Sequence, residues 1–524
     1  MGSASLTIAT KMNQIVCSMN ETPKRHGFLA LVLTSLASAA VLLVPFACGG
    51  LGERHQLVSA GGNSGTGGAG QGGSGGSEPD VIDAGQVGQG GDAGEASEGG
   101  STDGAAGEAG DLVFELRGAP LPFVPTAHGF GLNAVLSSGD PSLLRARVHP
   151  QGTSTWGSTV LPEVRGADIA QWNFEGLDPG VRFEYEILAS VPGGDQSLYA
   201  GSAVTQRQPG DSFTFALITD SHIGANLTYS NQGNPNTLKS ISAEVGTAQP
   251  DFIVNLGDML DFHEYGFNDP PPTGSITRSA YLNYRTLLGD ALGHAAHYGT
   301  IGNWEGENGC YTAEEIMRSQ QQRLLYLPGP APTSYPEGGG PSQDYYAFTW
   351  GDALFIVLNV MGYTPTEHLL SSNPGLPDDW TLGDAQFGWF ENTLANATSK
   401  WRFTFIHHAV GGAAGDSDDS AYGRGGGRAA YVGEQAKVHQ LMLQYGVQIF
   451  FYGHDHVFTD MQVDGIHYTL PGSSGAIWMF GQSQTGYAQS WLESGWSRVT
   501  VSPDSVNVQF LKMGGGVLYE YTLP

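Results

Sequence analysis

Hydrophobic and polar residues alternate along this chain in two different ways. Between about residues 111 and 208, segments such as 143–148 and 183–187 place apolar side chains at every second position, which is typical of half-buried β-strands. From about residue 211, short and nearly continuous apolar runs are separated by stretches with helical spacing. The second region is therefore predicted to be a layered α/β domain with buried strands.

Six apolar runs are the predicted strands of this α/β domain. They cover residues 213–219, 252–256, 297–301, 354–358, 402–406 and 447–452. A helix is predicted over residues 434–445, where Gly446 ends the helical pattern. Three later runs are predicted to be closing antiparallel strands, at 499–501, 506–510 and 517–523.

The region 111–208 is predicted to be a β-sandwich. Its residues 177–181 read Leu-Asp-Pro-Gly-Val, a tight turn in which Pro179 presets φ and Gly180 tolerates a positive φ. This turn and the strand after it resemble the signature of fibronectin-type sandwiches. Because no cluster of catalytic residues lies here, we expect a structural or substrate-framing role.

The N-terminal residues have the pattern of an export signal. Lys24 and Arg25 precede the uncharged apolar stretch 27–48. Cys48 follows Ala47 and precedes two glycines, which resembles the cleavage box of bacterial lipoproteins. Lipidation at Cys48 and a single membrane-spanning anchor remain open alternatives, since about 20 apolar residues can cross a bilayer. In every case an exported protein is expected. A cleaved signal would leave it secreted, whereas a lipid or an anchor would hold it at the cell envelope and be its only contact with the membrane.

Residues 49–110 are predicted to be a disordered tether. They are rich in Gly, Ser, Ala, Asp and Glu, and residues 56–113 contain no aromatic residue, Lys or Arg. Such a segment cannot bury enough apolar surface to offset its chain entropy. The predicted order is therefore a signal, lipoprotein or anchor segment at 1–48, the tether at 49–110, the sandwich at 111–208 and the α/β domain at 211–524.

Charge and cysteine content exclude several classes of function. The formal net charge is −29, so non-specific nucleic-acid binding is not expected, because the phosphate backbone would be repelled. A small phosphorylated substrate remains compatible with this charge, since bound cations reverse the local field. The three cysteines are Cys17, Cys48 and Cys310, which excludes a disulfide framework and a Cys-x-x-Cys metal site.

Polar clusters follow five of the predicted strands, where α/β folds place their sites. The clusters are Asp220-Ser221-His222, Gly257-Asp258, Gly302-Asn303-Trp304-Glu305, His407-His408 and Gly453-His454-Asp455-His456. Residues i and i+2 of an extended segment project to one side, so each Asp/His-x-His cluster is predicted to point both side chains at one ion. The same alternation predicts that only one of His407 and His408 faces the site.

In this order, the five clusters resemble the metallophosphoesterase (calcineurin-like) superfamily over residues 211–524. With the sandwich included, the chain resembles the purple acid phosphatase branch. The resemblance implies a catalytic domain with four layers, α/β/β/α. It also implies a metal-dependent phosphoric ester hydrolase that acts on a small phosphorylated substrate, either a phosphomonoester or a phosphodiester.

The resemblance implies two metal ions held by seven residues. The first ion would be held by Asp220, His222 and His456, the second by Asn303, His407 and His454, and both by a bridging Asp258. Carboxylate, imidazole and amide ligands suit Fe, Zn or Mn. Two such ions clamp a phosphoryl group and lower the pKa of a bound water, so a bridging hydroxide is expected to attack phosphorus. Asp220, Asp258, Asn303 and His407 would be the catalytic residues.

Two positions depart from the family pattern. Asp261 stands where purple acid phosphatases supply a Tyr ligand, and Trp304 stands where the family usually has a His that contacts the phosphate and assists the leaving group. An indole is a donor only and cannot act as an acid near neutrality. We expect slower turnover of unactivated monoesters, or another group in this role. The candidates for binding substrate are His263, His408, Arg424 and Arg428.

Trp304 also favours a competing hypothesis, a non-catalytic envelope protein that binds metals or a ligand without turnover. A third hypothesis is an adhesion module led by the sandwich, with a vestigial catalytic domain. Only aromatic residues such as Trp172 and Phe174 favour it, and these are expected in the sandwich core.

Overall fold

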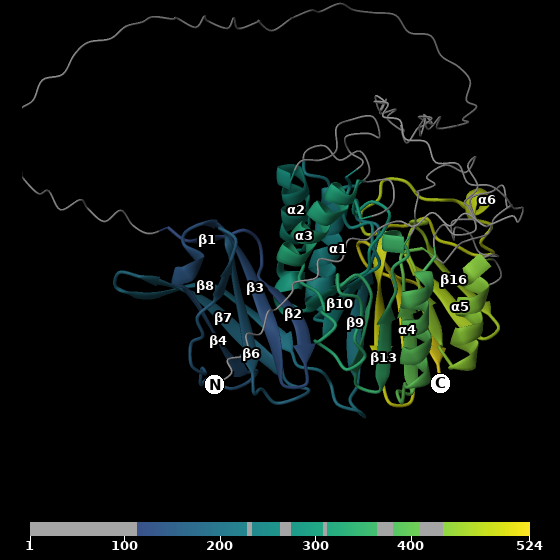
Figure 1. The fold of residues 1–524 in the computed structure, drawn as a ribbon, viewed down its shortest axis with the longest axis horizontal. Helices are drawn as coiled ribbons and strands as arrows, with labels where there is room; N and C mark the ends of the chain where they lie inside the picture. The colour runs from purple at the N-terminus through teal and green to yellow at the C-terminus, as the bar shows by residue number, and fades with distance from the viewer. Residues whose placement is uncertain (1–112, 228–232, 263–273, 308–311, 364–380, 409–432) are drawn as a thin grey trace, which may run out of the picture. The chain divides into compact units, whose positions relative to one another are not determined.

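The computed structural model describes residues 113–227, 233–262, 274–307, 312–363, 381–408 and 433–524 (Figure 1). The predicted signal and tether and all three cysteines lie outside the described residues, as do His263, Arg424 and Arg428. The predicted domain boundaries stay predictions.

Residues 115–204 form two antiparallel sheets around one apolar core. One sheet contains β1 (Glu115–Leu116), β2 (Leu121–Thr126), β3 (Gly129–Ser138), β5 (Glu163–Arg165) and β6 (Ile169–Glu175). The other contains β4 (Leu144–Pro150), β7 (Arg182–Val191) and β8 (Gly194–Val204). Trp172 and Phe174 of the first sheet share a buried cluster with Tyr185 of the second, because alternate residues of each strand point inward. The predicted strands are present, and their fibronectin-like character stays a prediction.

A six-stranded mixed sheet begins the second region. Its order is β11 (Ala296–Gly299), β10 (Phe252–Asn255), β9 (Phe213–Ile218), β18 (Gly495–Val501), β19 (Val506–Lys512) and β20 (Val517–Leu523). β9, β10 and β11 are parallel, and the last three strands are antiparallel, as the sequence predicts. Its outer face packs on α1 (Pro235–Ala248), α2 (Gly274–His294) and α3 (Ala313–Tyr326) through one apolar cluster.

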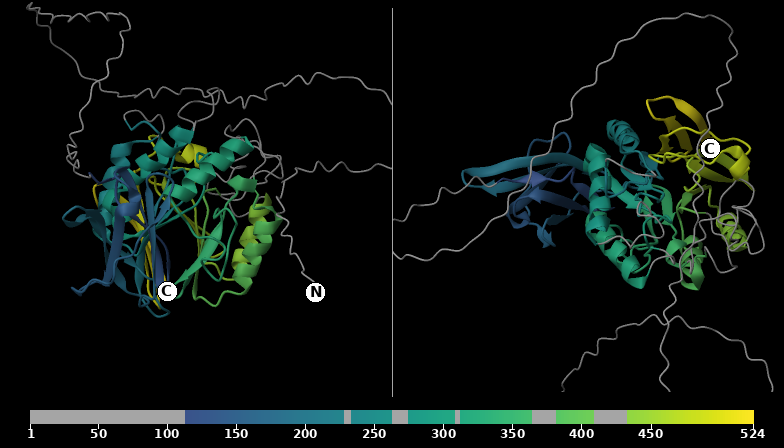
Figure 2. Two further views of the ribbon diagram at one scale, coloured as in Figure 1. Left: turned by 60° about the vertical axis from the view of Figure 1, so that its left-hand side comes forward. Right: turned by 90° about the horizontal axis from the view of Figure 1, so that it is seen from above.

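A second six-stranded mixed sheet lies against the first. Its order is β12 (Tyr346–Trp350), β13 (Ala353–Val357), β14 (Trp401–Phe405), β15 (Ile449–Phe451), β17 (Ile466–Pro471) and β16 (Phe458–Val463). α4 (Gly383–Ala395) and α5 (Gly433–Gln444) cover its outer face through another apolar cluster (Figures 1 and 2). A short helix, α6 (Gln482–Thr485), follows β17 in the chain.

Phenylalanine side chains fill the space between the two sheets. Phe215 and Phe252 stack at a ring-centroid distance of 5.2 Å, and Phe355 meets Phe215 edge-on at 5.3 Å and stacks on Phe405 at 5.7 Å. These rings belong to one buried cluster with members from both sheets. The helices therefore lie outside two sheets that share an aromatic core, and the predicted layered α/β fold is confirmed.

The described helices include none that is long and apolar enough to cross a membrane.

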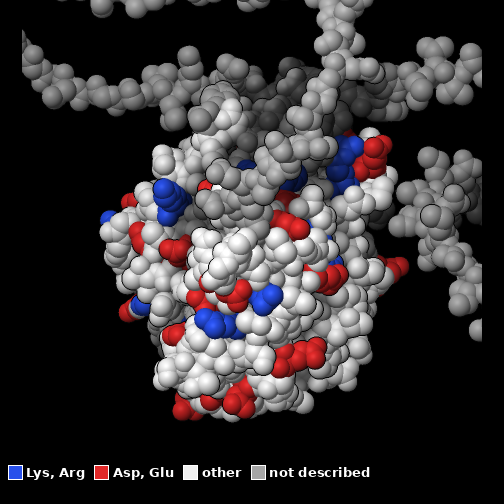
Figure 3. All heavy atoms as spheres, turned by 90° about the vertical axis from the view of Figure 1, so that its left-hand side faces the viewer, with Lys and Arg blue, Asp and Glu red and all other residues white. Residues whose placement is uncertain are grey.

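Acidic and basic side chains are interspersed on the face shown in Figure 3.

A buried arginine of α2 connects the N-terminal sheets (residues 115–204) to the helices. Arg285 of α2 is fully buried, and its guanidinium donates to the side-chain oxygen of Asn133 on β3 and to the carbonyl oxygen of Tyr326 at 2.9 Å. It also donates to the carbonyl oxygen of Asn133 at 3.0 Å. Burial lowers the pKa of Arg285 to about 10, so the group is still charged at neutral pH.

Replacing this arginine should destabilise the protein. Arg285→Leu leaves several buried acceptors without their donor, so we expect the free energy of unfolding to fall by about 2–4 kcal/mol, measured by urea denaturation. Arg165→Leu is the matched control, because Arg165 is an exposed partner of Glu163 and its loss should cost about 0.5 kcal/mol or less. Equal midpoints for the two variants would contradict the role given to Arg285.

Candidate metal centre

Five loops that follow parallel strands converge at the carboxyl ends of the two sheets. They come after β9, β10, β11, β14 and β15, and they carry all of the metal-binding residues expected from the sequence. Those residues are Asp220, His222, Asp258, Asn303, His407, His454 and His456. Each is nine-tenths or more buried.

One group of side chains joins Asp220, His222, Asp258 and His456. One ligand atom of each lies within 4.8 Å of the others. His456 Nε2 is 3.1 Å from His222 Nε2 and 3.4 Å from Asp220 Oδ1, and His222 Nε2 is 3.7 Å from Asp258 Oδ2. His456 Nδ1 lies 2.9 Å from the carbonyl oxygen of Trp478, a contact that orients the ring with Nε2 toward the group.

A second group lies on the other side of Asp258. His407 Nε2 is 3.1 Å from Asp258 Oδ2 and 3.2 Å from Asn303 Oδ1. His407 Nδ1 lies 2.7 Å from the carbonyl oxygen of Leu256, so the backbone of the neighbouring strand end fixes this ring. His454 joins His407 and His408 in a cluster of possible ligand atoms. Asp258 Oδ2 is therefore shared between the two groups.

The spacing around the Asn303 amide is that of a cation site when the amide oxygen faces the second group. Its oxygen lies 3.2 Å from Asp258 Oδ2, His407 Nε2 and His454 Nδ1. Ligand atoms around a tetrahedral cation are about 3.3 Å apart, because each lies about 2.0–2.1 Å from the ion. Turning the amide over would instead let its nitrogen donate to these three atoms and its oxygen accept from Trp304 Nε1 at 3.1 Å, the arrangement expected without a cation.

Five of the site residues have left-handed backbone conformations. The φ angles are 53° at Asp220, 48° at His222, 49° at Asp258, 78° at His454 and 56° at His456. Non-glycine residues with such angles cost about 1–3 kcal/mol each and cluster at functional sites. The prediction of extended backbone was therefore wrong for both Asp/His-x-His segments. The prediction that both side chains point at one ion was wrong for 454–456. His454 turns toward the second group and His456 toward the first.

His408 also differs from its predicted orientation. The alternation of a strand predicts that His407 and His408 point apart, but β14 ends at Phe405 and both histidines lie in the bend beyond it. The His408 ring lies 3.8 Å from the His454 ring and 4.8 Å from the His407 ring. His408 is thus buried against the second group. Asp261 is not among the residues whose ligand atoms meet in either group of described residues.

Glu305 is a residue of the site to which the sequence assigned no role. Its buried carboxylate accepts from the backbone N–H of Asp258 at 3.1 Å, Met259 at 2.5 Å, Leu260 at 3.2 Å and Gly302 at 2.5 Å. It therefore ties the loop after β10 to the loop after β11. Gly302 is necessary for this approach, since a Cβ there would lie 2.2 Å from Asp258 Oδ1. The signal available in the sequence was an acidic residue two positions after Asn303.

Several carboxylates are buried together at the site, so a nearby positive charge would favour their ionised forms. Burial raises the pKa of Asp220 well above its usual value, and the neighbouring charge of Asp258 raises it further. Burial raises the pKa of Glu305 to about 8, and Asp258 adds to this shift. A cation bound between these groups offsets both effects. The donor set, its spacing and its charge all fit the metals expected from the sequence.

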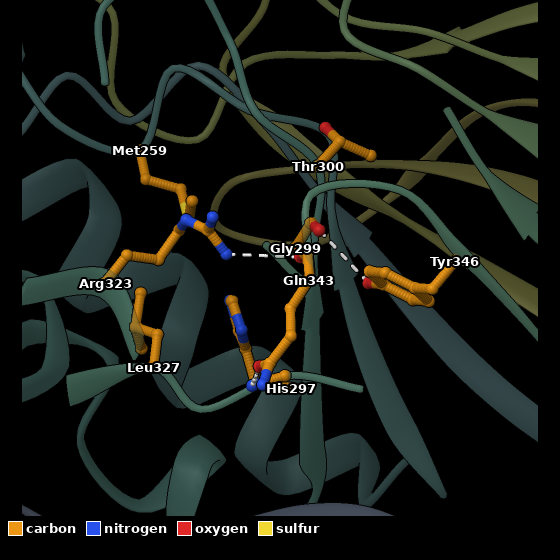
Figure 4. A pocket seen from close by; sticks show the side chains of 9 residues that line it. Met259, His297, Gly299, Thr300, Arg323, Leu327, Gln343 and Tyr346 are labelled. Carbon is orange, nitrogen blue, oxygen red and sulfur yellow. Dashed lines mark hydrogen bonds between the residues drawn. The ribbon is translucent and has the colours of Figure 1, made fainter. Parts of the chain in front are cut away.

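A cavity beside the ends of β10 and β11 is too small for a substrate (Figure 4). It has a volume of about 20 Å³, which is room for about one water molecule. Thr300 Oγ1 is buried there without a hydrogen-bond partner among the described residues. The labelled side chains that line it include Met259, His297, Arg323, Gln343 and Tyr346. We therefore assign this cavity to the packing behind the site.

Comparisons with known proteins agree with this geometry. Residues 213–458 match the family model described as calcineurin-like phosphoesterase. No curated protein matches the sequence. A solved structure described as PhoD superposes with a TM-score of 0.57 at 16 % identity, covering 78 % of this chain and 88 % of that one. A purple acid phosphatase from yellow lupin (Lupinus luteus) seeds superposes with a TM-score of 0.55 at 13 % identity, covering 77 % and 74 %. Residues 213–458 are therefore similar to the calcineurin-like phosphoesterase family.

Proposed function

We propose that this protein is a hydrolase of phosphomonoesters or phosphodiesters that works with two metal ions. The single observation that carries the proposal is the position of Asp258 Oδ2, 3.1 Å from His407 Nε2 and 3.7 Å from His222 Nε2. One carboxylate oxygen shared by two groups of ligand atoms is the arrangement that a bridging ligand needs. Asp220, His222 and His456 would hold the first ion, and Asn303, His407 and His454 the second.

The ligands favour Fe, Zn or Mn, because they combine imidazole nitrogens with carboxylate and amide oxygens. Two such cations, when bound, supply an activated water and neutralise charge on the phosphoryl group. The chain's own groups fix this geometry. The backbone carbonyl oxygens of Leu256 and Trp478 orient His407 and His456. Thr219 Oγ1 donates to Asp220 Oδ2 at 2.8 Å.

We propose that the protein acts outside the cytoplasm, because of the N-terminal sequence pattern. Residues 1–48 would direct export, and the tether would separate the folded domains from the cell envelope. The sandwich, which we propose to be fibronectin-like, would brace the catalytic domain. Tyr185 of β7 supports this role, because its hydroxyl donates to the carbonyl oxygen of Gly293 at 2.9 Å.

The alternative is a protein that binds metals or a ligand without turnover. Trp304 is the residue that favours it, because an indole cannot protonate a leaving group. Metal analysis combined with assays on aryl phosphomonoesters and diesters separates the two functions. Full metal occupancy without hydrolysis of any ester would favour the alternative.

Removal of the bridging carboxylate charge should abolish most activity. Asp258→Asn is expected to lower kcat/KM on an aryl phosphate by at least about a hundredfold, because it weakens both cation sites at once. Mass spectrometry of metal content should show fewer than two ions per chain. Asp504→Asn, at an exposed turn, is the matched control and should retain activity and metal. Wild-type activity in Asp258→Asn would exclude the two-metal proposal.

Metal removal should destabilise the protein more as the pH rises. The pKa values of Asp220 and Glu305 are raised in the folded protein. Without cations, the contribution of these two groups to the free energy of unfolding is therefore fully present below about pH 4, and it is lost as the pH rises toward about 8. We expect chelator-treated protein to melt roughly 5 °C or more below the metal-loaded protein at pH 8, with a smaller difference at pH 5. Thermal denaturation at both values measures this. Glu305→Gln removes one titrating group, so the difference in melting temperature should depend less on pH in this variant. A difference that shrinks with rising pH would contradict the role given to the buried carboxylates.

The identity of residue 304 should determine how the enzyme treats poor leaving groups. Trp304→His introduces a group that can protonate the leaving oxygen, so turnover of an alkyl phosphate should rise about tenfold or more relative to an aryl phosphate. Trp304→Phe is the control, because it changes the ring without adding an acid. If the two variants give the same alkyl-to-aryl ratio, residue 304 does not limit leaving-group departure.

A further inference from the structure

Aromatic side chains gather beside the first group of ligands. The Trp304 ring lies 5.0 Å from the His222 ring, and the Trp478 ring lies 5.0 Å from His222 and 4.7 Å from His456. The two indoles are 6.1 Å apart at an angle of 52°, and Phe480 lies 5.4 Å from His456. Trp304, Trp478 and Phe480 are called the aromatic wall below.

The aromatic wall is partly open to solvent. All three of its side chains are half-buried, and the neighbouring Ile477 is 59 % exposed. The histidines that it contacts are buried, with His222 at 0 % and His456 at 2 % exposure. The apolar surface therefore borders the buried candidate ligands and continues to side chains that are partly exposed.

The position of Trp304 adds a chemical restriction. Its indole N–H faces the amide of Asn303 at 3.1 Å, and its backbone N–H donates to Asp258 Oδ1 at 2.9 Å. The backbone hydrogen bond holds this residue at the site, but its side chain offers no acid to the leaving oxygen. A leaving group that departs without protonation suits this position better than an alkoxide.

We propose that the aromatic wall selects phosphoesters whose leaving group is an aromatic alcohol, and this inference rests on the proposed hydrolase function. Both observations point to the same class, because an aryl ring packs on the indoles and an aryl oxide is a good leaving group. In the reaction, a water oxygen forms a bond to phosphorus while the bond between phosphorus and the aryl oxygen breaks. The electron pair leaves on the aryl oxide, and the proton lost by the water passes to solvent.

Binding of two phosphonates that cannot be hydrolysed tests the selection separately from catalysis. Metal-loaded full-length protein is titrated with phenylphosphonate and with methylphosphonate by isothermal calorimetry. We expect phenylphosphonate to bind about tenfold or more tightly, since stacking on an aromatic side chain gives a preference of this size. Trp478→Leu and, separately, Phe480→Leu should reduce the preference to below about threefold, with metal content checked for each variant.

Trp156→Leu is the matched control, because Trp156 is also half-buried but packs on His149 and Arg147 in the N-terminal sheets. It should keep the full preference. Equal affinity of wild-type protein for both phosphonates would overturn the aromatic-wall inference and leave the two-metal proposal standing. Failure of both phosphonates to bind protein that holds two cations would overturn the proposed function and this inference with it.

Discussion

The site depends on burying the carboxylates of Asp220 and Asp258 in one pocket. Both side chains are essentially inaccessible to solvent, and each raises the free energy of the other's ionised form. Glu305 adds a third buried carboxylate, whose charge is met by backbone N–H groups from two loops. Cations between Asp220 and Asp258 would convert this unfavourable burial into strong binding. The histidines and Asn303 would then complete the coordination.

The rest of the fold supplies the rigidity that such a site needs. Left-handed conformations at five ligand residues are unfavourable locally, so tertiary contacts must hold them. The aromatic core between the sheets fixes the strands from which the loops emerge. Glu305 fixes two of those loops to each other, so the strain is opposed both by packing and by hydrogen bonds.

Trp304 differs from the expected residue both in its acid–base chemistry and in its contacts. A ring at this position contacts His222 and belongs to an apolar surface with Trp478. Under the proposed function, a residue that supplies no acid would also offer a surface for an aromatic group. Both properties would narrow the choice of leaving group.

The sequence by itself determined the α/β class, the strand positions and the set of candidate ligand residues. Apolar strands followed by Asp, Asn or His are a local pattern, and parallel strands bring their carboxyl ends together. Only the tertiary structure decided how the backbone turns these side chains toward one another. The sequence predicted that His454 and His456 share a side, and that His407 and His408 point apart. Both rules assume extended backbone, whereas these residues lie in loops whose φ angles are set by contacts with other strands. The role of Glu305 likewise depends on backbone groups distant in sequence, which no local pattern reports.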